Sequence, residues 1–297
     1  MTLTIMTAPA EDIPEALDTR PEEARPEEAE EGGREALGER MKRYEAATDQ
    51  QLTNDKPLII RIDGHGFSRF TRGFDKPFDP RLHDAMAQTA ADLLQYFPAA
   101  SLAYTQSDEI TLVFPATESA RPFNGRVGKL ASLAAGYAST RFNHHLAQAA
   151  NLPANKLGIA HFDGRVFSVP DAAEALNNLI WRAKIDCRRN SIFGFGRSHY
   201  SSKQLHGLNG EAIVAKVLAE KGVDFWTSTP TWARYGTTIK REQYEWEGVD
   251  GLTGAEVKST RTRTRSEDIP WWEFNDRNLA LVTKKFWDGD GAPRDKE

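Results

Sequence analysis

The stretch that decides the fold is Pro57-Leu-Ile-Ile-Arg-Ile-Asp63, an apolar run that ends in Gly64-His65-Gly66. A short apolar run closed by glycines is typical of a buried β-strand followed by a tight turn. The sequence therefore predicts a central strand that presents Asp63 where the strand leaves the sheet.

Helix and strand patterns alternate after this run. Apolar spacing predicts helices over residues 81–96 and 127–146, and strands at 103–104, 110–114 and 157–162. The order strand, helix, strand, strand, helix, strand is the split βαβ arrangement of the ferredoxin-like fold. We therefore expect an α+β protein in which residues 106–109 form a hairpin turn.

The C-terminal part has a more helical pattern. Residues 172–187 and 210–220 suit helices, and residues 232–239 suit a late strand. The last thirty or so residues look irregular, with Trp271, Trp272 and Trp287 as isolated anchors. We expect a disordered acidic tail over 1–36, a catalytic domain over 37–170, opened by a helix at Leu37, and a helical or irregular region over 171–297.

Bulk composition favours a cytoplasmic globular protein. The 297 residues are 39% hydrophobic, and no apolar run reaches the roughly 18 residues of a membrane span. The N-terminus has no basic and apolar signal pattern. The single cysteine, Cys187, excludes an internal disulfide. We expect Cys187 to be a small buried residue.

The net charge is unevenly distributed. Residues 11–35 contain eleven acids and three arginines. The formal net charge is −5, of which this segment contributes −8, so the rest of the chain carries +3. This balance permits a nucleic-acid partner without requiring one.

Three carboxylates are candidates for chemistry. Asp63 ends the first strand, and Asp108 and Glu109 lie in the predicted hairpin. In the split βαβ order these elements are neighbours at the centre of the sheet, so the carboxylates converge. Like charges this close favour a bound cation, and Mg²⁺ is commonly held by one or two carboxylates plus substrate phosphates. Turn formation or helix capping is the ordinary alternative for each aspartate.

Glycines flank His65 on both sides. Without side chains, Gly64 and Gly66 let backbone N–H groups approach a triphosphate closely. Two metal ions about 3.5–4 Å apart can activate an attacking hydroxyl and stabilise a leaving oxygen. Phosphoryl chemistry of this kind needs no protein nucleophile.

Several motifs, in order along the chain, resemble the tRNA-histidine guanylyltransferases and their relatives, which extend RNA in the 3′-to-5′ direction. The matching stretches are Arg61-Ile-Asp-Gly-His-Gly-Phe67 with Arg69-Phe70, Asp75-Lys-Pro77, Tyr104-Thr-Gln-Ser-Asp-Glu109, Phe123 through Lys129, Phe162-Asp-Gly-Arg165, and Trp181-Arg182 with Asp186-Cys187. Together they cover roughly residues 37–241.

The resemblance implies a polymerase-like palm and a two-step reaction. ATP would activate the 5′-monophosphate of a tRNA, and GTP would then be added. Two Mg²⁺ ions would lie on Asp63, Asp108 and the Gly64 carbonyl. The nucleotide site would comprise Gly64, His65, Gly66, Phe67, Lys76, Ser107, Glu109, Arg126 and Lys129, with Glu109 as a supporting residue. His65 stands where many members carry arginine. The resemblance also implies a homotetramer.

One stretch departs from the family pattern. Eukaryotic members carry His-Ile-Asn-Asn after the Asp-Cys pair, whereas this chain has Arg188-Arg189-Asn190-Ser191. Strict selection of tRNA-histidine is therefore not expected, and templated repair of 5′ ends is the closer match. Candidate RNA-binding residues are Arg188, Arg189, Asn190, Arg197, His199 and Lys203, of which the last three are expected in a loop. Residues 258–265, which alternate Arg with Thr, suit an RNA-contacting arm or a plain loop.

Two other functions are compatible with parts of the pattern. A palm-domain nucleotide cyclase shares the geometry, but its usual Gly-Gly-Asp-Glu-Phe hairpin differs from Ser107-Asp108-Glu109. A catalytically silent RNA-binding protein is the second, and loss of either aspartate would favour it. Both Asp63 and Asp108 are present.

Overall fold

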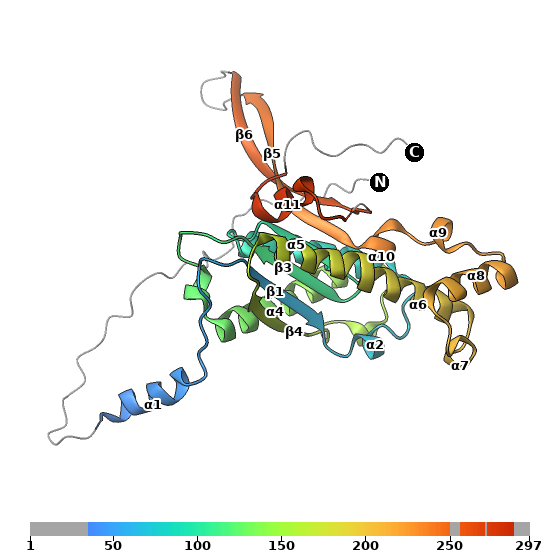
Figure 1. Ribbon diagram of the computed structural model, residues 1–297, viewed down its shortest axis with the longest axis horizontal. Coiled ribbons are helices and arrows are strands. Elements are labelled where there is room, and N and C mark those ends of the chain that lie inside the picture. The colour runs from blue at the N-terminus through green and yellow to red at the C-terminus, as the bar shows by residue number, and fades with distance from the viewer. Residues whose placement is uncertain (1–34, 250–255, 271, 288–297) are drawn as a thin grey trace.

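The computed structural model of the chain describes residues 35–249, 256–270 and 272–287. The centre of this described part is a six-stranded antiparallel sheet with the strand order β4-β1-β3-β2-β5-β6. The strands are β1 (Leu58–Gly64), β2 (Leu102–Gln106), β3 (Glu109–Phe114), β4 (Phe162–Ser168), β5 (Thr237–Val249) and β6 (Glu256–Glu267). With its helices, the chain has a mixed α+β fold (Figure 1).

Four of these strands follow the order expected from the sequence. Helix α3 (Pro80–Tyr96) connects β1 to β2, and α4 (Val127–Ala147) connects β3 to β4. The resulting order β4-β1-β3-β2 is that of a split βαβ unit. Helix α3 begins at Pro80 because the Asp79 carboxylate accepts a hydrogen bond from the backbone N–H of Arg81.

One face of the sheet packs on α3 and α4. Alternate residues of the strands, including Ile60, Ile62 and Leu112, are fully buried there against Leu93 and Phe142. Because side chains alternate between the two faces of a strand, the residues between them, among them Asp63, belong to the opposite face. The larger core therefore lies behind the carboxylates.

The opposite face is covered by a continuous run of helix. It consists of α5 (Ala172–Ile180), a π-helical segment (Trp181–Cys187) and α6 (Arg188–His199). Leu102, Tyr104 and Val113 of the sheet form a second core with Leu176 of α5 and with Trp272, which precedes α11 (Asp276–Thr283). This run positions Arg182 and Asp186 over the sheet.

A small helical lobe continues from α6. It contains α7 (Ser202–Leu205), α8 (Gly210–Lys221), α9 (Phe225–Ser228) and α10 (Thr231–Tyr235). Its own core includes Phe195, Ile213 and Phe225. Figure 1 shows this lobe at one side of the sheet, with α10 returning the chain to β5.

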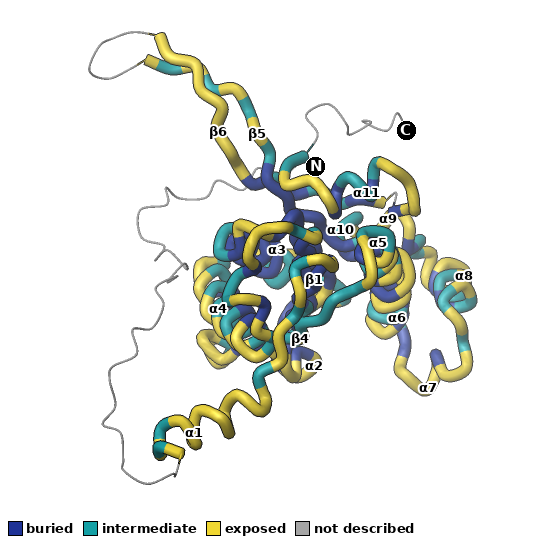
Figure 2. The backbone as a smooth tube through the Cα atoms, turned by 60° about the vertical axis from the view of Figure 1, so that its left-hand side comes forward, coloured by how far each residue is buried: buried dark blue, intermediate teal, exposed yellow. Residues whose placement is uncertain are grey.

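Two peripheral elements extend from the body. Helix α1 (Leu37–Ala46), which the sequence predicted, has no buried residue. Strands β5 and β6 continue past the sheet as a long hairpin, the β5–β6 arm (Figures 1 and 2). Short elements complete the description: α2 (Phe67–Phe70), η1 (Pro122–Gly125) and η2 (Ala154–Lys156). Among the described residues, no helix combines the length and apolarity needed to cross a membrane.

The strand predicted over residues 157–162 is wrong in its position. Strand β4 starts at Phe162, and Asp163 and Gly164, expected to end a strand, lie inside it. Gly164 is needed there because a Cβ would come within 2.8 Å of the Ala131 carbonyl oxygen of α4. A glycine in a strand often marks such a close backbone approach rather than a turn.

Three predictions for the C-terminal region are also corrected. Residues 231–235 are helical, with Pro230 as N-cap, and the strand begins only at Thr237 after Gly236 at φ 73°. The region expected to be helical or irregular supplies β5 and β6 to the sheet, and residues 258–265 are part of β6. Trp272 is buried ahead of α11, while Trp271 and residues 1–34, where most of the predicted tail falls, lie outside the described residues.

Candidate active site

A row of polar side chains crosses one end of the sheet. Asp63 of β1 lies directly opposite Glu109 of β3 and Asp163 of β4, and Glu109 lies opposite Gln106 of β2. Directly opposed residues point to the same face of a sheet. Four neighbouring strands thus present Gln106, Glu109, Asp63 and Asp163 in one line, and three of the four are acidic.

The turn between β2 and β3 brings Asp108 to this row. Ser107 has a left-handed backbone, φ 52°, and the Gly64 N–H donates to the Asp108 carbonyl oxygen at 2.9 Å. The Ser107 hydroxyl donates to Asp108 Oδ1, also at 2.9 Å. The structure therefore brings together the two aspartates expected from the sequence, from positions 45 residues apart.

The environment of Asp108 disfavours its charge. Burial raises the pKa of the Asp108 carboxyl, and the neighbouring Asp63 raises it further, while the hydrogen bond from Ser107 acts in the opposite direction. No basic side chain forms an ion pair with Asp108 among the described residues. A cation placed between Asp108 and Asp63 would therefore stabilise the charged form of Asp108.

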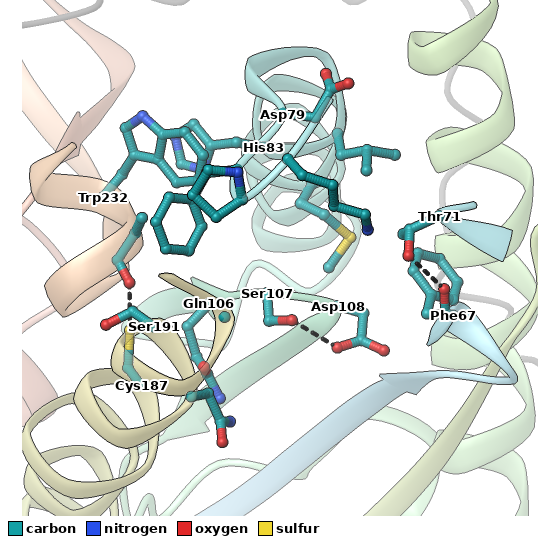
Figure 3. A pocket seen from close by; sticks show the side chains of 18 of the residues that line it. Phe67, Thr71, Asp79, His83, Gln106, Ser107, Asp108, Cys187, Ser191 and Trp232 are labelled. Carbon is teal, nitrogen blue, oxygen red and sulfur yellow. Dashed lines mark hydrogen bonds between the residues drawn. The ribbon is translucent and has the colours of Figure 1, made fainter. Parts of the chain in front are cut away.

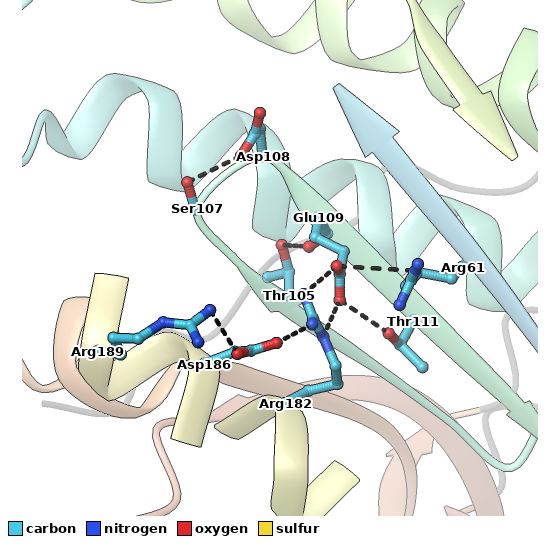
Figure 4. Close-up of polar contacts among 9 residues, drawn as sticks. All are labelled: Arg61, Thr105, Ser107, Asp108, Glu109, Thr111, Arg182, Asp186 and Arg189. Atoms are coloured by element: carbon cyan, nitrogen blue, oxygen red, sulfur yellow. Dashed lines mark hydrogen bonds and ion pairs between the residues drawn. The ribbon is translucent and has the colours of Figure 1, made fainter. Parts of the chain in front are cut away.

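Glu109, unlike Asp108, has basic side chains as partners (Figure 4). Its carboxylate pairs with Arg182 of the π-helical segment, and Arg61 Nε lies 3.9 Å away. Arg182 also pairs with Asp186, whose other oxygen accepts from Arg189 at 2.7 Å. Glu109 was predicted to lie in the turn. It is instead the first residue of β3, and it is 5% exposed. Its structural partner is Arg182.

A pocket opens beside Asp108 (Figure 3). Its volume is about 350 Å³, within the range of ligand-binding cavities. Of the residues expected to bind nucleotide, Phe67, Lys76 and Ser107 line it; the predicted metal ligand Asp108 and, from α6, Asn190 line it too. Helices α2, α3, α6 and α10 form the remaining walls.

His65 and the glycines around it form the turn next to the pocket. The His65 N–H donates to the His161 carbonyl oxygen at 2.9 Å, and the two imidazole rings stack with centroids 4.9 Å apart. Gly66 has φ 66° and begins α2. A Cβ on Gly64 would lie 2.3 Å from the Phe67 ring, so only glycine fits at Gly64.

Arg126 and Lys129 lie elsewhere. Both are at the start of α4, and neither lines the pocket. Arg126 Nε donates to Asp49 at 2.6 Å, and Gln51, two residues after Asp49, forms a β-bridge with Arg126. Lys129 Nζ lies 5.4 Å from the centroid of the Phe123 ring. Within one chain, the structure does not bring these two cations to Asp63 and Asp108.

The candidate RNA-binding residues lie on helices. Arg188 and Arg189 begin α6, where Arg188 covers the Trp226 ring at 4.9 Å. The loop expected around Arg197, His199 and Lys203 is not present, because the first two are in the last turn of α6 and Lys203 is in α7. Ser201 caps α7 through a capping box with Gln204, which is a sequence signal that identifies this helix start.

Other side chains at the site were not singled out from the sequence. Arg61 lies directly opposite Arg165 of β4, one row behind Asp63 and Asp163 on the same face. The strand spacing would have revealed this pair once β4 was placed correctly. His83 and Trp232 of the pocket gave no such signal, because they are 149 residues apart and only the fold brings them together.

Comparisons with known proteins point to one family. The family model described as tRNAHis guanylyltransferase (Thg1) matches residues 38–170. An uncharacterized protein of Acanthamoeba polyphaga mimivirus, R259, is 35% identical over 280 residues, which cover 86% of this chain and 92% of that protein.

Two solved structures are similar along most of their length. A bacterial tRNA(His) guanylyltransferase (Thg1)-like protein in complex with ATP has a TM-score of 0.63 and 35% identity, covering 69% of this chain and 88% of its own. A bacterial Thg1-like protein in complex with GTP has a TM-score of 0.62 and 30% identity, covering 78% and 91%.

These observations define the class of the protein first: it is a nucleotidyltransferase with a mixed α+β catalytic fold. Within that class the chain belongs to the tRNAHis guanylyltransferase (Thg1) family and is a Thg1-like guanylyltransferase. The family resemblance of its sequence motifs is therefore confirmed.

Proposed function

We propose that this protein adds GMP, or templated nucleotides, to the 5′ end of tRNA in the 3′-to-5′ direction. The observation that carries the proposal is the meeting of Asp63 and Asp108 beside a pocket of nucleotide size. The similar bacterial structures, which are complexes with ATP and with GTP, support nucleoside triphosphates as substrates. The family supports tRNA as the acceptor.

The carboxylates fit two Mg²⁺ ions. Asp108 is half-buried beside Asp63 without a basic partner among the described residues, so a divalent cation would relieve their repulsion. Mg²⁺ suits two carboxylates, because it keeps waters and substrate phosphates as its other ligands. Bound there with the Gly64 carbonyl, the ions would polarise the phosphate and stabilise the leaving oxygen.

The two steps are displacements at phosphorus. In the first, a 5′-phosphate oxygen of the tRNA attacks the α-phosphorus of ATP, the bond to pyrophosphate breaks, and the tRNA carries an AMP group. In the second, the 3′-hydroxyl of GTP attacks the activated 5′-phosphorus, loses its proton and releases AMP. Arg61 and Arg165, one row behind Asp63, are placed to bind phosphate oxygens near the reacting centre.

Basic and aromatic side chains of the β5–β6 arm support an RNA acceptor. Arg261 covers the Trp246 ring at 3.5 Å, and Arg263 covers the Tyr244 ring at 4.8 Å. The strand register places these four side chains on one face of the arm. Arginine with stacked aromatics is typical of RNA-binding surfaces. A nucleotide cyclase needs no such surface.

The choice of tRNA is proposed to be broad. Asn190 is the single position of Arg188-Arg189-Asn190-Ser191 that agrees with the eukaryotic motif, and it lines the pocket. Arg189 is engaged by Asp186. These differences favour the repair of truncated 5′ ends over strict maturation of tRNA-histidine. The homotetramer expected from the family stays a prediction, which light scattering can test.

One assay tests the proposed function. The purified protein is incubated with Mg²⁺, ATP, labelled GTP and tRNA transcripts that are full-length or lack the first 5′ nucleotide. We expect incorporation at 5′ ends, with truncated transcripts of several tRNAs accepted. Exclusive use of intact tRNA-histidine would refute the broad choice. Absence of incorporation into every transcript would refute the nucleotidyl transfer itself.

A further inference from the structure

The pocket beside Asp108 continues to an aromatic wall formed by α3 and α10. The His83 ring stacks on the Trp232 indole with centroids 4.2 Å apart and an interplanar angle of 8°. The Phe78 ring is oriented edge-on to the Trp232 indole, with the two centroids 6.0 Å apart. All three residues line the pocket. A flat, largely apolar wall of this kind suits a planar heterocycle.

His83 is held neutral and has no partner for its nitrogens. Burial lowers the pKa of its imidazole to about 4. Neither ring nitrogen has a hydrogen-bond partner among the described residues. A neutral imidazole has one N–H donor and one nitrogen acceptor. Both hydrogen-bonding groups are therefore available to a ligand in the pocket.

Gln106 provides a second unpartnered polar group. It is only 5% exposed and lines the same pocket from the end of β2. Its side-chain amide makes no hydrogen bond with any residue that the structure describes. Because Gln106 lines the pocket, its amide is open to a ligand bound there and can both donate and accept a hydrogen bond.

The groups left for a ligand differ between the two sides of the pocket. In Figure 3, His83, Trp232 and Gln106 lie on one side, and Asp108 lies on the other side, towards Phe67. Asp79, near His83, is already paired with Arg81. A nucleotide has the same division, with charged phosphates at one end and a neutral base at the other. The carboxylate side belongs to the phosphates, since the metal ions of the proposed function would be held there.

We propose that His83 and Gln106 select the base of the nucleoside triphosphate that this pocket binds. This inference rests on the proposed function and extends it from the reacting phosphates to the choice of nucleotide. His83 lines the pocket from α3 and Gln106 lines it from the end of β2, and a base that hydrogen-bonds to both would give each a partner. A site built to hydrogen-bond a substrate rejects analogues that leave its polar groups unpaired.

The test is steady-state kinetics of the activation step with ATP, GTP, CTP and UTP. Release of labelled pyrophosphate in the presence of 5′-monophosphorylated tRNA gives kcat and KM for each nucleotide. Three variants are compared: His83→Phe keeps the stacked ring without nitrogens, Gln106→Leu removes the amide, and His83→Gln restores a donor and an acceptor. His144→Phe, at an exposed position of α4, is the matched control.

We expect kcat/KM of the wild-type protein for its best nucleotide to exceed that for its poorest by more than about tenfold. His83→Phe and Gln106→Leu should each reduce this preference about 3- to 10-fold through KM, with kcat nearly unchanged. His83→Gln should recover part of it, and His144→Phe should match the wild type.

Three results would overturn the inference. The first is equal use of all four nucleotides by the wild type, and the second is an unchanged preference in both His83→Phe and Gln106→Leu. The third is a change in these variants of KM for tRNA alone. Each of these leaves the proposed function standing if Asp63→Asn abolishes pyrophosphate release. If Asp63→Asn has wild-type activity, the proposed function fails first.

Discussion

Two hairpins of the same sheet differ in almost every physical respect. The hairpin β2–β3 is buried along both strands, and its turn at Ser107-Asp108 is held by the N–H of Gly64. The β5–β6 arm has strands of 13 and 12 residues, and most of their outer parts are exposed (Figure 2). The first carries acidic groups at its turn, whereas the second carries both arginines and glutamates along its strands.

The difference shows how burial separates chemistry from recognition in this molecule. In the buried hairpin, desolvation raises the pKa of Asp108 and the surrounding bonds fix its position. A group held this rigidly can serve a reacting centre. On the exposed arm, Arg261 is solvated and Arg263 is half exposed and paired with Glu242, so their attraction for phosphates is weaker and salt-dependent.

The largest effect is expected at Asp108, in the turn between β2 and β3. Asp108→Asn removes one charge from the pair that holds the metal ions, and we expect kcat for nucleotide addition to fall by at least about 10³-fold. Circular dichroism and thermal melting should match the wild type. Asp84→Asn, an exposed carboxylate of α3, is the control and should retain full activity. Comparable activity of Asp108→Asn and Asp84→Asn would show that the turn is not catalytic.

The next effect concerns the support of this hairpin. Arg182→Met leaves Glu109 buried, with only Arg61 nearby at 3.9 Å. Loss of one partner of a buried ion pair should lower the free energy of unfolding by about 3 kcal/mol. Urea denaturation measures the change. The double variant Arg182→Met/Glu109→Gln should recover part of it, and an Arg182→Met protein as stable as the wild type would contradict this role.

A smaller effect comes from the neutral histidine of the pocket. The pKa of His83 is lowered from 6.5 to about 4 in the folded protein, so the unfolded chain takes up a proton first as pH falls. The free energy of unfolding should therefore fall by at most about 3 kcal/mol, because of His83, as pH drops from 6.5 towards 4. The melting temperature measured across this range should fall less steeply for His83→Phe. Parallel profiles for the two proteins would exclude His83 as the cause.

The smallest effect is expected on the exposed arm. The double variant Arg261→Gln/Arg263→Gln should raise Kd for tRNA about tenfold at 0.15 M salt, and each lost phosphate contact should reduce the salt slope by about 1. Lys258→Gln, on the opposite face of the arm, should change binding little. Fluorescence anisotropy with labelled tRNA measures both quantities. If Lys258→Gln weakens binding more than the double variant, the basic face is not the RNA-binding face.

The two hairpins also differ in how well the sequence predicts them. The β2–β3 unit was predictable because its apolar strands and polar turn are local patterns, and its place beside β1 follows from the split βαβ order. The strand character of β6 was not, because residues 258–265 have no apolar side chains and their partners, residues 240–247, lie beyond the end of the predicted 232–239 segment.

Long-range pairing limited the prediction of the site in the same way. Asp63 and Asp108 could be predicted to meet, since each lies at the end of a recognisable strand. Arg182 could not be assigned to Glu109, because a π-helical turn sets its direction. The start of β4 was misplaced because Gly164 was taken as a turn signal, and the pair Arg61 and Arg165 was missed with it.

The central claim is that Asp63 and Asp108 catalyse nucleotide transfer to an RNA 5′ end. The most direct test is a single-turnover reaction of excess protein with 5′-monophosphorylated tRNA, Mg²⁺ and α-labelled ATP, followed by addition of GTP. We predict that the wild type forms a 5′-adenylylated tRNA, which GTP converts to tRNA with one added guanylate, and that Asp63→Asn and Asp108→Asn form neither product. Adenylylation by either variant at the wild-type rate, or label joined only at the 3′ end, would contradict the claim.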